Sequence, residues 1–223
     1  MVKSVEGVYR QGKVELLEPA PDMAEARVLI TFLPATAEAT VLADLDAYSP
    51  EYENLFSRIH HRAQLGYGPT NEEILCVTKW KLYRLTRKHF SAVKRDGDRI
   101  RDCLLRAGLT DPLVRKQAVS ALVGLDHIKM ALASALLVAC WPDTYSILDR
   151  RALQQLREAN CHQEPWPLDS DLWRQDVDGF FDRYLLAVER FRVAEGLPSF
   201  RVADRVLWGR SVRNQIQKGL TEP

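Results

Sequence analysis

Cysteine is scarce in this chain and widely scattered, which excludes two kinds of site. The 223 residues include four cysteines, at positions 76, 103, 140 and 161, and no two of them form a C-x-x-C pair. Structural zinc sites and iron–sulfur clusters take their ligands from closely spaced cysteines. The sequence therefore predicts neither kind of site, and we expect no metal ion or other cofactor.

Long apolar runs are missing as well. A membrane-spanning helix needs about 20 apolar residues, and the most apolar stretch, at 129–140, is far shorter. The first residues, MVKSVEGVYRQGK, lack the apolar core of a signal peptide. With 46% hydrophobic and 27% charged residues, the composition is that of an ordinary globular protein. We expect a cytoplasmic protein with reduced thiols and no contact with a membrane.

A large excess of one charge is also absent, since the formal net charge is only +1. Taken alone, this value argues against nucleic-acid binding, because affinity for a phosphate backbone comes from basic side chains. The distribution indicates otherwise: residues 55–129 hold 15 basic and 7 acidic side chains, whereas residues 1–54 hold 4 and 10. The middle of the chain is therefore a candidate for contact with a polyanion.

The chain is organised around the stretch 121–155, whose centre is apolar. A tight turn around Gly124 leads to a helix from about Lys129 to Cys140 that is apolar on nearly every face, which predicts a place in the core. Trp-Pro-Asp at 141–143 ends this helix, and an extended piece follows at 145–148. Asp149 then opens a second helix, and its carboxylate is suited to capping the helix start.

These residues resemble those of the helix-hairpin-helix DNA glycosylases, and within them the 8-oxoguanine glycosylase branch. The likeness rests on the Leu122-Val-Gly124 turn, on the small-residue helix that begins Lys129-Met-Ala131, and on a single Asp149 that opens the next helix. It covers about a fifth of the chain. The resemblance implies a multi-helix domain that contains a hairpin of two helices.

The resemblance also implies a chemistry. In the bifunctional members of the family, a lysine attacks the sugar C1′ of a flipped-out nucleotide, and an aspartate supports the developing positive charge. Lys129 and Asp149 match those positions. An amine is a nucleophile only when deprotonated, and burial beside apolar groups lowers its pKa, while a nearby carboxylate stabilises an oxocarbenium-like centre. The leading hypothesis is therefore a DNA-repair glycosylase that excises a damaged base.

Other features of the stretch support a plainer interpretation. Asp126 stands where the family has a second glycine, and Lys129 comes one residue late. A lysine in the first turn of a buried helix commonly extends its ammonium into solvent, and an aspartate at a helix start is commonly only a cap. The alternative is a non-enzymatic interaction or DNA-binding protein on a glycosylase-like scaffold.

The first 33 residues have the pattern of strands. Val8 precedes Gln11-Gly12, which suits a two-residue turn, and Val14-Glu-Leu16 returns antiparallel, with a third strand expected at 27–32. The order VEGVYRQGKVELLEP followed by ARVLITF resembles the AF-type antitoxin domain of prokaryotic toxin–antitoxin systems, which implies a homodimer contact or a toxin partner. The alternative is a hairpin appendage without a separate function.

The rest of the chain has helical patterns. The predicted helices span 51–64, 71–95, 99–107, 113–122, 129–140, a segment from 149, 170–195 and 201–210, and residues 211–223 are expected to fray. Thr70-Asn-Glu-Glu73 has the form of a capping box. We therefore expect a mainly α protein with a small β module at 1–33, a linker at 34–49 and a glycosylase-like helical domain at 50–223.

The predicted helix 71–95 interleaves basic and aromatic residues. Its basic residues are Lys79, Lys81, Arg84, Arg87, Lys88, Lys94 and Arg95, and its aromatic residues include Trp80, Tyr83, His89 and Phe90. This pattern suits a surface that follows phosphates and stacks on bases; the alternative is a solvated face over buried aromatic rings. The candidate contacts to double-stranded DNA are Lys79, Lys81, Arg84, Gly124, Arg150 and Arg151.

Overall fold

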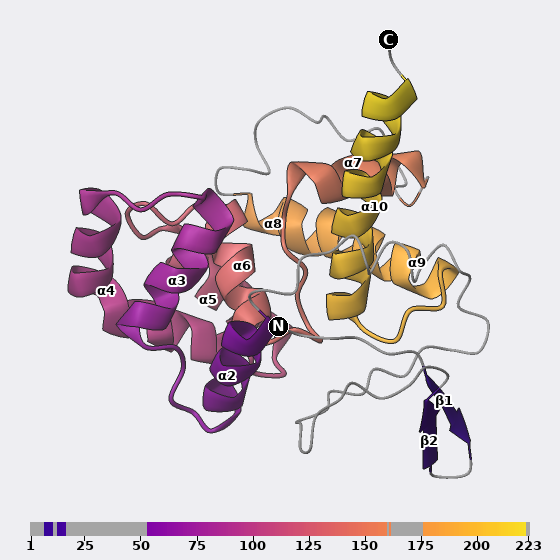
Figure 1. The fold of residues 1–223 in the computed structure, drawn as a ribbon. Coiled ribbons are helices and arrows are strands. Elements are labelled where there is room, and N and C mark those ends of the chain that lie inside the picture. Colours follow the sequence, from indigo (N-terminus) through magenta and orange to yellow (C-terminus); the bar gives the residue numbers. More distant parts are fainter. Residues whose placement is uncertain (1–6, 11–12, 17–52, 160, 162–175, 222–223) are drawn as a thin grey trace, which may run out of the picture. The chain divides into compact units, whose positions relative to one another are not determined.

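The computed structural model describes residues 7–10, 13–16, 53–159, 161 and 176–221 (Figure 1). The chain divides into two compact units, residues 1–35 and 36–223. The division falls at the start of the segment predicted as a linker. The two units are described separately below.

The N-terminal unit contains the predicted β-hairpin. Strands β1 (Gly7–Arg10) and β2 (Lys13–Leu16) pair antiparallel, with Gly7 opposite Leu16 and Arg10 opposite Lys13. This register leaves two residues between the strands, as a two-residue turn requires. The strand predicted at 27–32 lies outside the described residues, and the likeness to antitoxin domains stays a prediction.

The second unit is helical, which confirms the mainly α class. Its helices are α2 (Glu53–Gln64), α3 (Asn71–Leu82), α4 (Arg87–Arg106), α5 (Pro112–Val123), α6 (Met130–Cys140), α7 (Arg150–Glu158), α8 (Val177–Gly179), the π-helical η2 (Phe180–Leu185), α9 (Leu186–Ala194) and α10 (Phe200–Thr221). The glycosylase-like arrangement of these helices stays a prediction.

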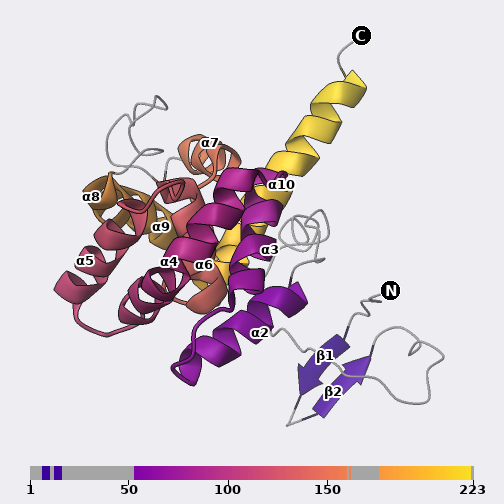
Figure 2. The ribbon, with the colours of Figure 1, turned by 90° about the vertical axis from the view of Figure 1, so that its left-hand side faces the viewer.

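Helix α6 forms the centre of the first group of helices. Ten of its residues are buried, from Met130 and then from Leu132 to Cys140, and helices α2, α3, α4 and α5 all pack against it (Figure 2). The prediction of a core helix from the apolar stretch is confirmed. A second group follows, in which α10 packs against α7 and α9.

The start of α3 is fixed by the capping box that the sequence predicts. The Glu73 N–H donates to Thr70 Oγ1 at 3.1 Å, and the Thr70 N–H donates to Glu73 Oε2 at 2.8 Å. Glu73 also accepts from Arg58 Nε at 3.1 Å. These bonds satisfy amide groups that the first turn of a helix leaves unpaired.

The prediction of one continuous helix over 71–95 is wrong. Helix α3 ends at Leu82, because Tyr83 adopts the left-handed conformation with φ 58°, and α4 begins after Thr86. Helix α4 then runs through 96–98, where a break before Arg99 is predicted. Position 97 of this helix is a glycine, and a Cβ there would lie 2.3 Å from Asn71 Oδ1, so a larger residue would require the Asn71 side chain to move.

The C-terminal helices also differ from the prediction. The helix expected at 170–195 is described from Val177 and includes a π-helical segment, and Gly196 follows it with φ 65°; residues 170–175 lie outside the described ranges. Helix α10 continues to Thr221, so the expected fraying from 211 is wrong for the described residues. Ser211 is buried, and Asn214 donates to Gln155 of α7 at 3.3 Å, so packing supports this extension.

Candidate nucleic-acid interface

The turn between α5 and α6 is the hairpin that the sequence predicts. Gly124 is the C-cap of α5 and is exposed, while Leu125 and Ile128 anchor the turn in the core. His127 has φ 64°, a left-handed conformation that a side chain other than glycine rarely adopts. Local backbone bonds close the turn, from Leu125 N–H to Leu122 O and from Ile128 N–H to Leu125 O, each at 3.2 Å.

Lys129 stands at the N-cap of α6 and is exposed. The sequence hypothesis places its amine beside apolar groups, and that part of the hypothesis is wrong. The reason is geometric: the N-cap residue lies outside the first helical turn, so the apolar faces of α6 bury Met130 and its successors but leave Lys129 in solvent. No hydrogen bond or ion pair of the Lys129 side chain links it to another described residue.

Asp149 caps α7, as predicted, and a different lysine meets it. Its Oδ1 accepts from the Arg151 N–H at 2.9 Å, and its Oδ2 lies 2.9 Å from Lys81 Nζ. Burial alone would raise the pKa of Asp149, but the ammonium of Lys81 and the Arg151 N–H hold it below its ordinary value. The Asp149 side chain is 31% exposed, so an ionised carboxylate lies at the surface of the start of α7.

Lys81 is therefore not available to DNA, and its assignment as a phosphate contact is wrong. Its side chain is only 9% exposed. Besides Asp149, it donates to Leu148 O at 3.1 Å. The ion pair joins the end of α3 to the start of α7, two segments 68 residues apart in the sequence.

The residues before Asp149 form a buried polar network that sequence patterns do not reveal. The link Tyr145–Leu148 belongs to no helix or strand, and all of it is buried. Asp204 of α10 accepts from Ser146 Oγ at 2.9 Å and from the Ile147 N–H at 3.0 Å. The buried α10 segment therefore pairs part of the backbone of an irregular link, which burial would otherwise leave without hydrogen bonds.

Other side chains complete this network. Tyr184 donates to Ile147 O at 2.6 Å, and the Leu148 N–H donates to Ser134 Oγ at 2.9 Å. Arg201 forms an ion pair with Asp204 at 2.9 Å and a second one with Glu53 of α2. Burial raises the pKa of Asp204, against the opposing effect of the Arg201 charge. The network fixes the route of the chain into Asp149.

Arg150 and Arg151 differ in their availability. Arg150 is exposed, whereas Arg151 is partly buried with its guanidinium 5.4 Å from the centre of the Trp208 ring. A cation over an aromatic ring is stabilised by the ring quadrupole. Arg150 is therefore the one of the two whose charge is directed to solvent.

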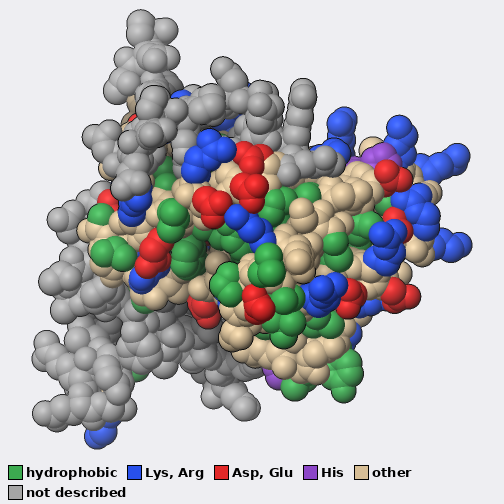
Figure 3. Space-filling view, turned by 180° about the vertical axis from the view of Figure 1, so that it is seen from behind, with side chains coloured by type: hydrophobic (Ala, Val, Ile, Leu, Met, Phe, Trp, Pro, Cys, Tyr) green, Lys and Arg blue, Asp and Glu red, His purple; other side chains and the backbone are tan. Residues whose placement is uncertain are grey.

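The connection between α3 and α4 carries an exposed basic surface. We define the α3–α4 basic surface as Tyr83, Arg84, Arg87, Lys88, Phe90 and Lys94. All six residues are exposed, no acidic residue occurs between positions 74 and 95, and no ion pair links these four cations to a described acidic side chain. Figure 3 shows Lys and Arg side chains gathered along its right-hand edge, which corresponds to the left-hand side of Figure 1, where α4 lies.

Two of the predicted DNA contacts, Arg84 and Lys79, lie in this connection or in the last turn of α3 before it. Arg84 is exposed, in agreement with the role predicted for it. Lys79 is also exposed, but its Nζ donates to Tyr83 O at 2.8 Å. Trp80, by contrast, packs with its ring centre 5.0 Å from that of Phe56. The segment thus packs the half-buried Trp80 ring against the core and exposes Tyr83 and Phe90. The alternative of a solvated face over buried rings holds only in part, and the nucleic-acid contact stays a prediction.

Helix α4 and the hairpin are joined by direct contacts. Arg95 of α4 binds Asp126 at 3.0 Å and Asp96 at 2.7 Å. The rings of His89 and His127 lie edge to face with their centres 6.2 Å apart. The negative charge of Asp126, unfavourable in a turn that faces phosphate, is therefore countered by Arg95.

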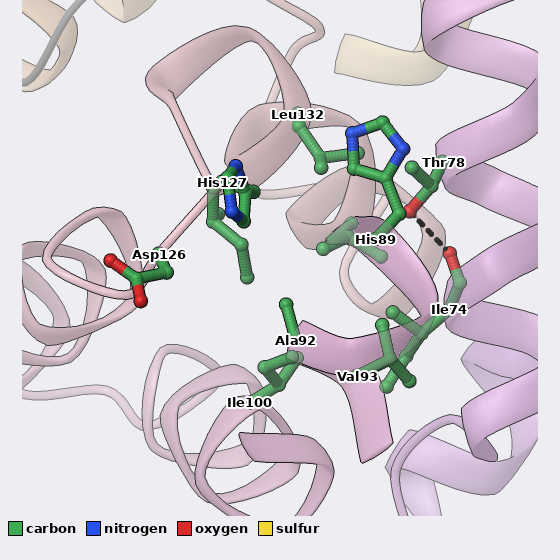
Figure 4. A pocket seen from close by; sticks show the side chains of 11 residues that line it. Ile74, Thr78, His89, Ala92, Val93, Ile100, Asp126, His127 and Leu132 are labelled. Atoms are coloured by element: carbon green, nitrogen blue, oxygen red, sulfur yellow. Dashed lines mark hydrogen bonds between the residues drawn. The ribbon is translucent and has the colours of Figure 1, made fainter. Parts of the chain in front are cut away.

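Between these segments lies a small pocket with the two histidines at one side and apolar residues such as Ala92 and Val93 opposite (Figure 4). Its free volume of about 10 Å³ accommodates a water molecule and not a nucleobase. His89 Nδ1 accepts from the Thr86 N–H at 3.0 Å, which holds the start of α4. Burial, with the charges of His127 and Arg84, lowers the pKa of His89.

The described residues form no metal site and no disulfide. None of their His, Cys, Asp and Glu side chains form a group that could hold a metal ion, and their four cysteines are free thiols. No helix in the described ranges has the length and apolar character needed to cross a membrane. His162, a loop histidine, lies outside the described residues.

Comparison of this chain with models of protein families, with curated proteins and with solved structures finds no match. Function is therefore inferred from the geometry of the chain itself.

Proposed function

We propose that the helical unit binds duplex DNA through the α3–α4 basic surface, with the α5–α6 turn beside it. The observation that carries the proposal is a run of exposed cations, Arg84, Arg87, Lys88 and Lys94, in a segment without one acidic residue. Side chains of this kind bind phosphates and release counterions, which supplies affinity independent of base sequence.

The hairpin extends this surface. Its contacts with α4 through Arg95 and His89 hold the turn against the helix that carries Arg87, Lys88 and Lys94, and the exposed Lys129 follows this turn. The N-terminal amides of α6 and the ammonium of Lys129 are both favourable to a phosphate. Arg95, which lies 3.0 Å from Asp126, offsets part of the negative charge of the turn.

The test is fluorescence anisotropy with a labelled duplex at several salt concentrations. We expect the double variant Arg84→Ala/Arg87→Ala to bind roughly tenfold more weakly at low salt, and the slope of log K against log salt to fall by about 2, close to 0.9 for each lost phosphate contact. The matched control Arg157→Ala/Arg190→Ala removes two arginines outside the surface and should change neither value. Equal losses in both variants would show a diffuse charge effect and reject the proposed surface.

Base excision is the second candidate function, and the state of Asp149 favours it. This carboxylate is ionised, partly exposed and held at a helix start by Lys81, and the same α3 end carries Tyr83 and Arg84. On this proposal the neutral amine of Lys129 attacks C1′ of an extruded nucleotide, the glycosidic bond breaks and the base leaves with a proton, and Asp149 stabilises the positive charge of the transition state. The C1′–O4′ bond of the sugar then opens as O4′ takes up a proton, and the imine formed between Lys129 and C1′ is what borohydride reduces to a stable amine.

Borohydride trapping on duplexes that contain 8-oxoguanine, uracil or an abasic site tests this candidate. A covalent adduct that Lys129→Gln abolishes and Lys13→Gln, at an exposed lysine of the N-terminal unit, retains would establish Lys129 as the nucleophile. An adduct that survives Lys129→Gln would assign the amine elsewhere. DNA binding without any adduct would leave the binding function alone.

A further inference from the structure

We infer that Tyr83 and Phe90 form a stacking platform for unpaired bases, so that the α3–α4 basic surface prefers DNA with exposed bases over intact duplex. The inference rests on the proposed DNA binding and names the feature of DNA that this surface selects. It begins from the exposure of the two rings, which is 78% for Tyr83 and 50% for Phe90. Rings of this size usually contribute to cores.

The backbone at Tyr83 gives the first argument. The C-cap of α3 is left-handed, with φ 58°, a conformation that glycine or asparagine adopts at little cost and tyrosine does not. Tyr83 buries little surface that could offset this cost, and Lys79 Nζ holds its carbonyl oxygen at 2.8 Å. A strained residue with an exposed ring, fixed by a hydrogen bond, is typical of a binding position.

The surroundings of the rings give the second argument. Arg84, Arg87 and Lys88 lie between Tyr83 and Phe90 in the sequence and are all exposed. Cations that follow a backbone, combined with rings that stack on bases, are the features of surfaces that bind single strands. In an intact duplex each base face is covered by its neighbours, so the rings have bases to stack on only where pairing is interrupted.

The experiment compares two labelled duplexes of equal length, one fully paired and one with a central bubble of mismatched bases. Both carry the same number of phosphates, so a difference in affinity reports on the bases. We expect the full chain to bind the bubble roughly tenfold more tightly, the order of magnitude of one base–aromatic stack. Tyr83→Asn removes the ring and suits the left-handed backbone, and it should bring the ratio of affinities close to one, as should Phe90→Ala.

The controls separate stacking from other effects. Tyr67→Ala removes another tyrosine that is 67% exposed and should leave the ratio unchanged, while Tyr83→Trp should retain it. Circular dichroism melting checks that each variant is folded. Intact-duplex binding without preference for the bubble, or an equal loss on both DNAs in Tyr83→Asn, would overturn the stacking inference and leave the proposed function standing. Failure to bind either DNA would overturn both.

Discussion

Two connections between helices treat their polar groups in opposite ways. The loop 83–86 exposes Tyr83, Arg84 and Thr86 to solvent, and a single lysine bond holds its left-handed start. The link 145–148 is buried throughout, and side chains from four helical segments bond its polar groups. Both are irregular segments, but only the buried link must have its hydrogen bonds satisfied within the protein.

Lys81 connects the two segments. It lies two residues before Tyr83, and it binds Leu148 O and Asp149 Oδ2 at the far end of the buried link. The buried link thus provides a rigid support, and the exposed loop presents side chains whose replacement changes few internal contacts. This division is the usual one between a scaffold and a binding loop, and it predicts where mutations affect stability and where they affect binding.

The largest expected effect on stability is that of Asp204→Ala. The change leaves the buried Arg201 without one of its carboxylates and removes the acceptor of Ser146 Oγ and the Ile147 N–H. Loss of one partner from a buried ion pair costs about 3–5 kcal/mol, which chemical denaturation measures directly. Asp98→Ala, at a side chain that is 96% exposed, is the control and should stay within about 0.5 kcal/mol of the parent.

Lys81→Met should have the next largest effect. It keeps the length of the side chain but leaves Asp149 without its ammonium and Leu148 O without a donor, at a cost of about 1–3 kcal/mol. The pKa of Asp149 should rise in the variant, which NMR titration of the carboxyl carbon can follow. The pKa of Asp149 is lower in the folded than in the unfolded parent, so this carboxylate contributes stability above the unfolded pKa, and the contribution is lost as pH falls through the folded pKa. The variant lacks this contribution and should therefore lose less stability in acid than the parent.

Lys79→Met is the matched control for this variant, since Lys79 also bonds a backbone oxygen but is exposed. It should cost less than about 1 kcal/mol. Equal losses in the two variants would break the comparison between a buried support and an exposed loop.

Local patterns in the sequence were sufficient to predict part of this structure. The apolar stretch identifies α6, Thr70 to Glu73 identifies the start of α3, and Asp149 is recognisable as a cap, because each of these depends on neighbours in the chain. The break at Tyr83 was missed since the residue normally expected at a left-handed helix end is glycine. Helix α10 was predicted too short because its last turns depend on packing with α7.

The candidate site was predicted less well, for a physical reason. Sequence spacing pairs Asp149 with Lys129, but the fold brings Lys81 to Asp149 from a different helix. Asp204 and Ser146 carry no local signal, because they meet only when folding brings together two buried residues that are 58 positions apart in the sequence. The exposure of Arg84 could be predicted, because charged side chains are exposed by default and no distant residue among those described pairs with this one to bury it.

The smallest expected effect is a pH dependence confined to the exposed loop. His89 Nδ1 accepts the Thr86 N–H, so protonation of that nitrogen breaks the bond that holds the start of α4. The pKa of His89 is lowered in the fold, chiefly by burial; its contribution to stability is therefore present above the unfolded pKa near 6.5 and is lost as pH falls through the folded value. Loss of such a cap costs about 1 kcal/mol or less.

Hydrogen exchange of the first amides of α4, measured between pH 7.5 and 5, resolves this effect from global unfolding. Protection there should decrease in acid in the parent chain and in His61→Ala, whose histidine is exposed and lies on α2. In His89→Ala protection should already be low at pH 7.5 and change little. The amides of Ile147 and Leu148 are bonded to Asp204 and Ser134 and not to His89, so protonation of His89 should leave their protection unchanged; a parallel loss at both segments would mean that the loop and the buried link open as one unit.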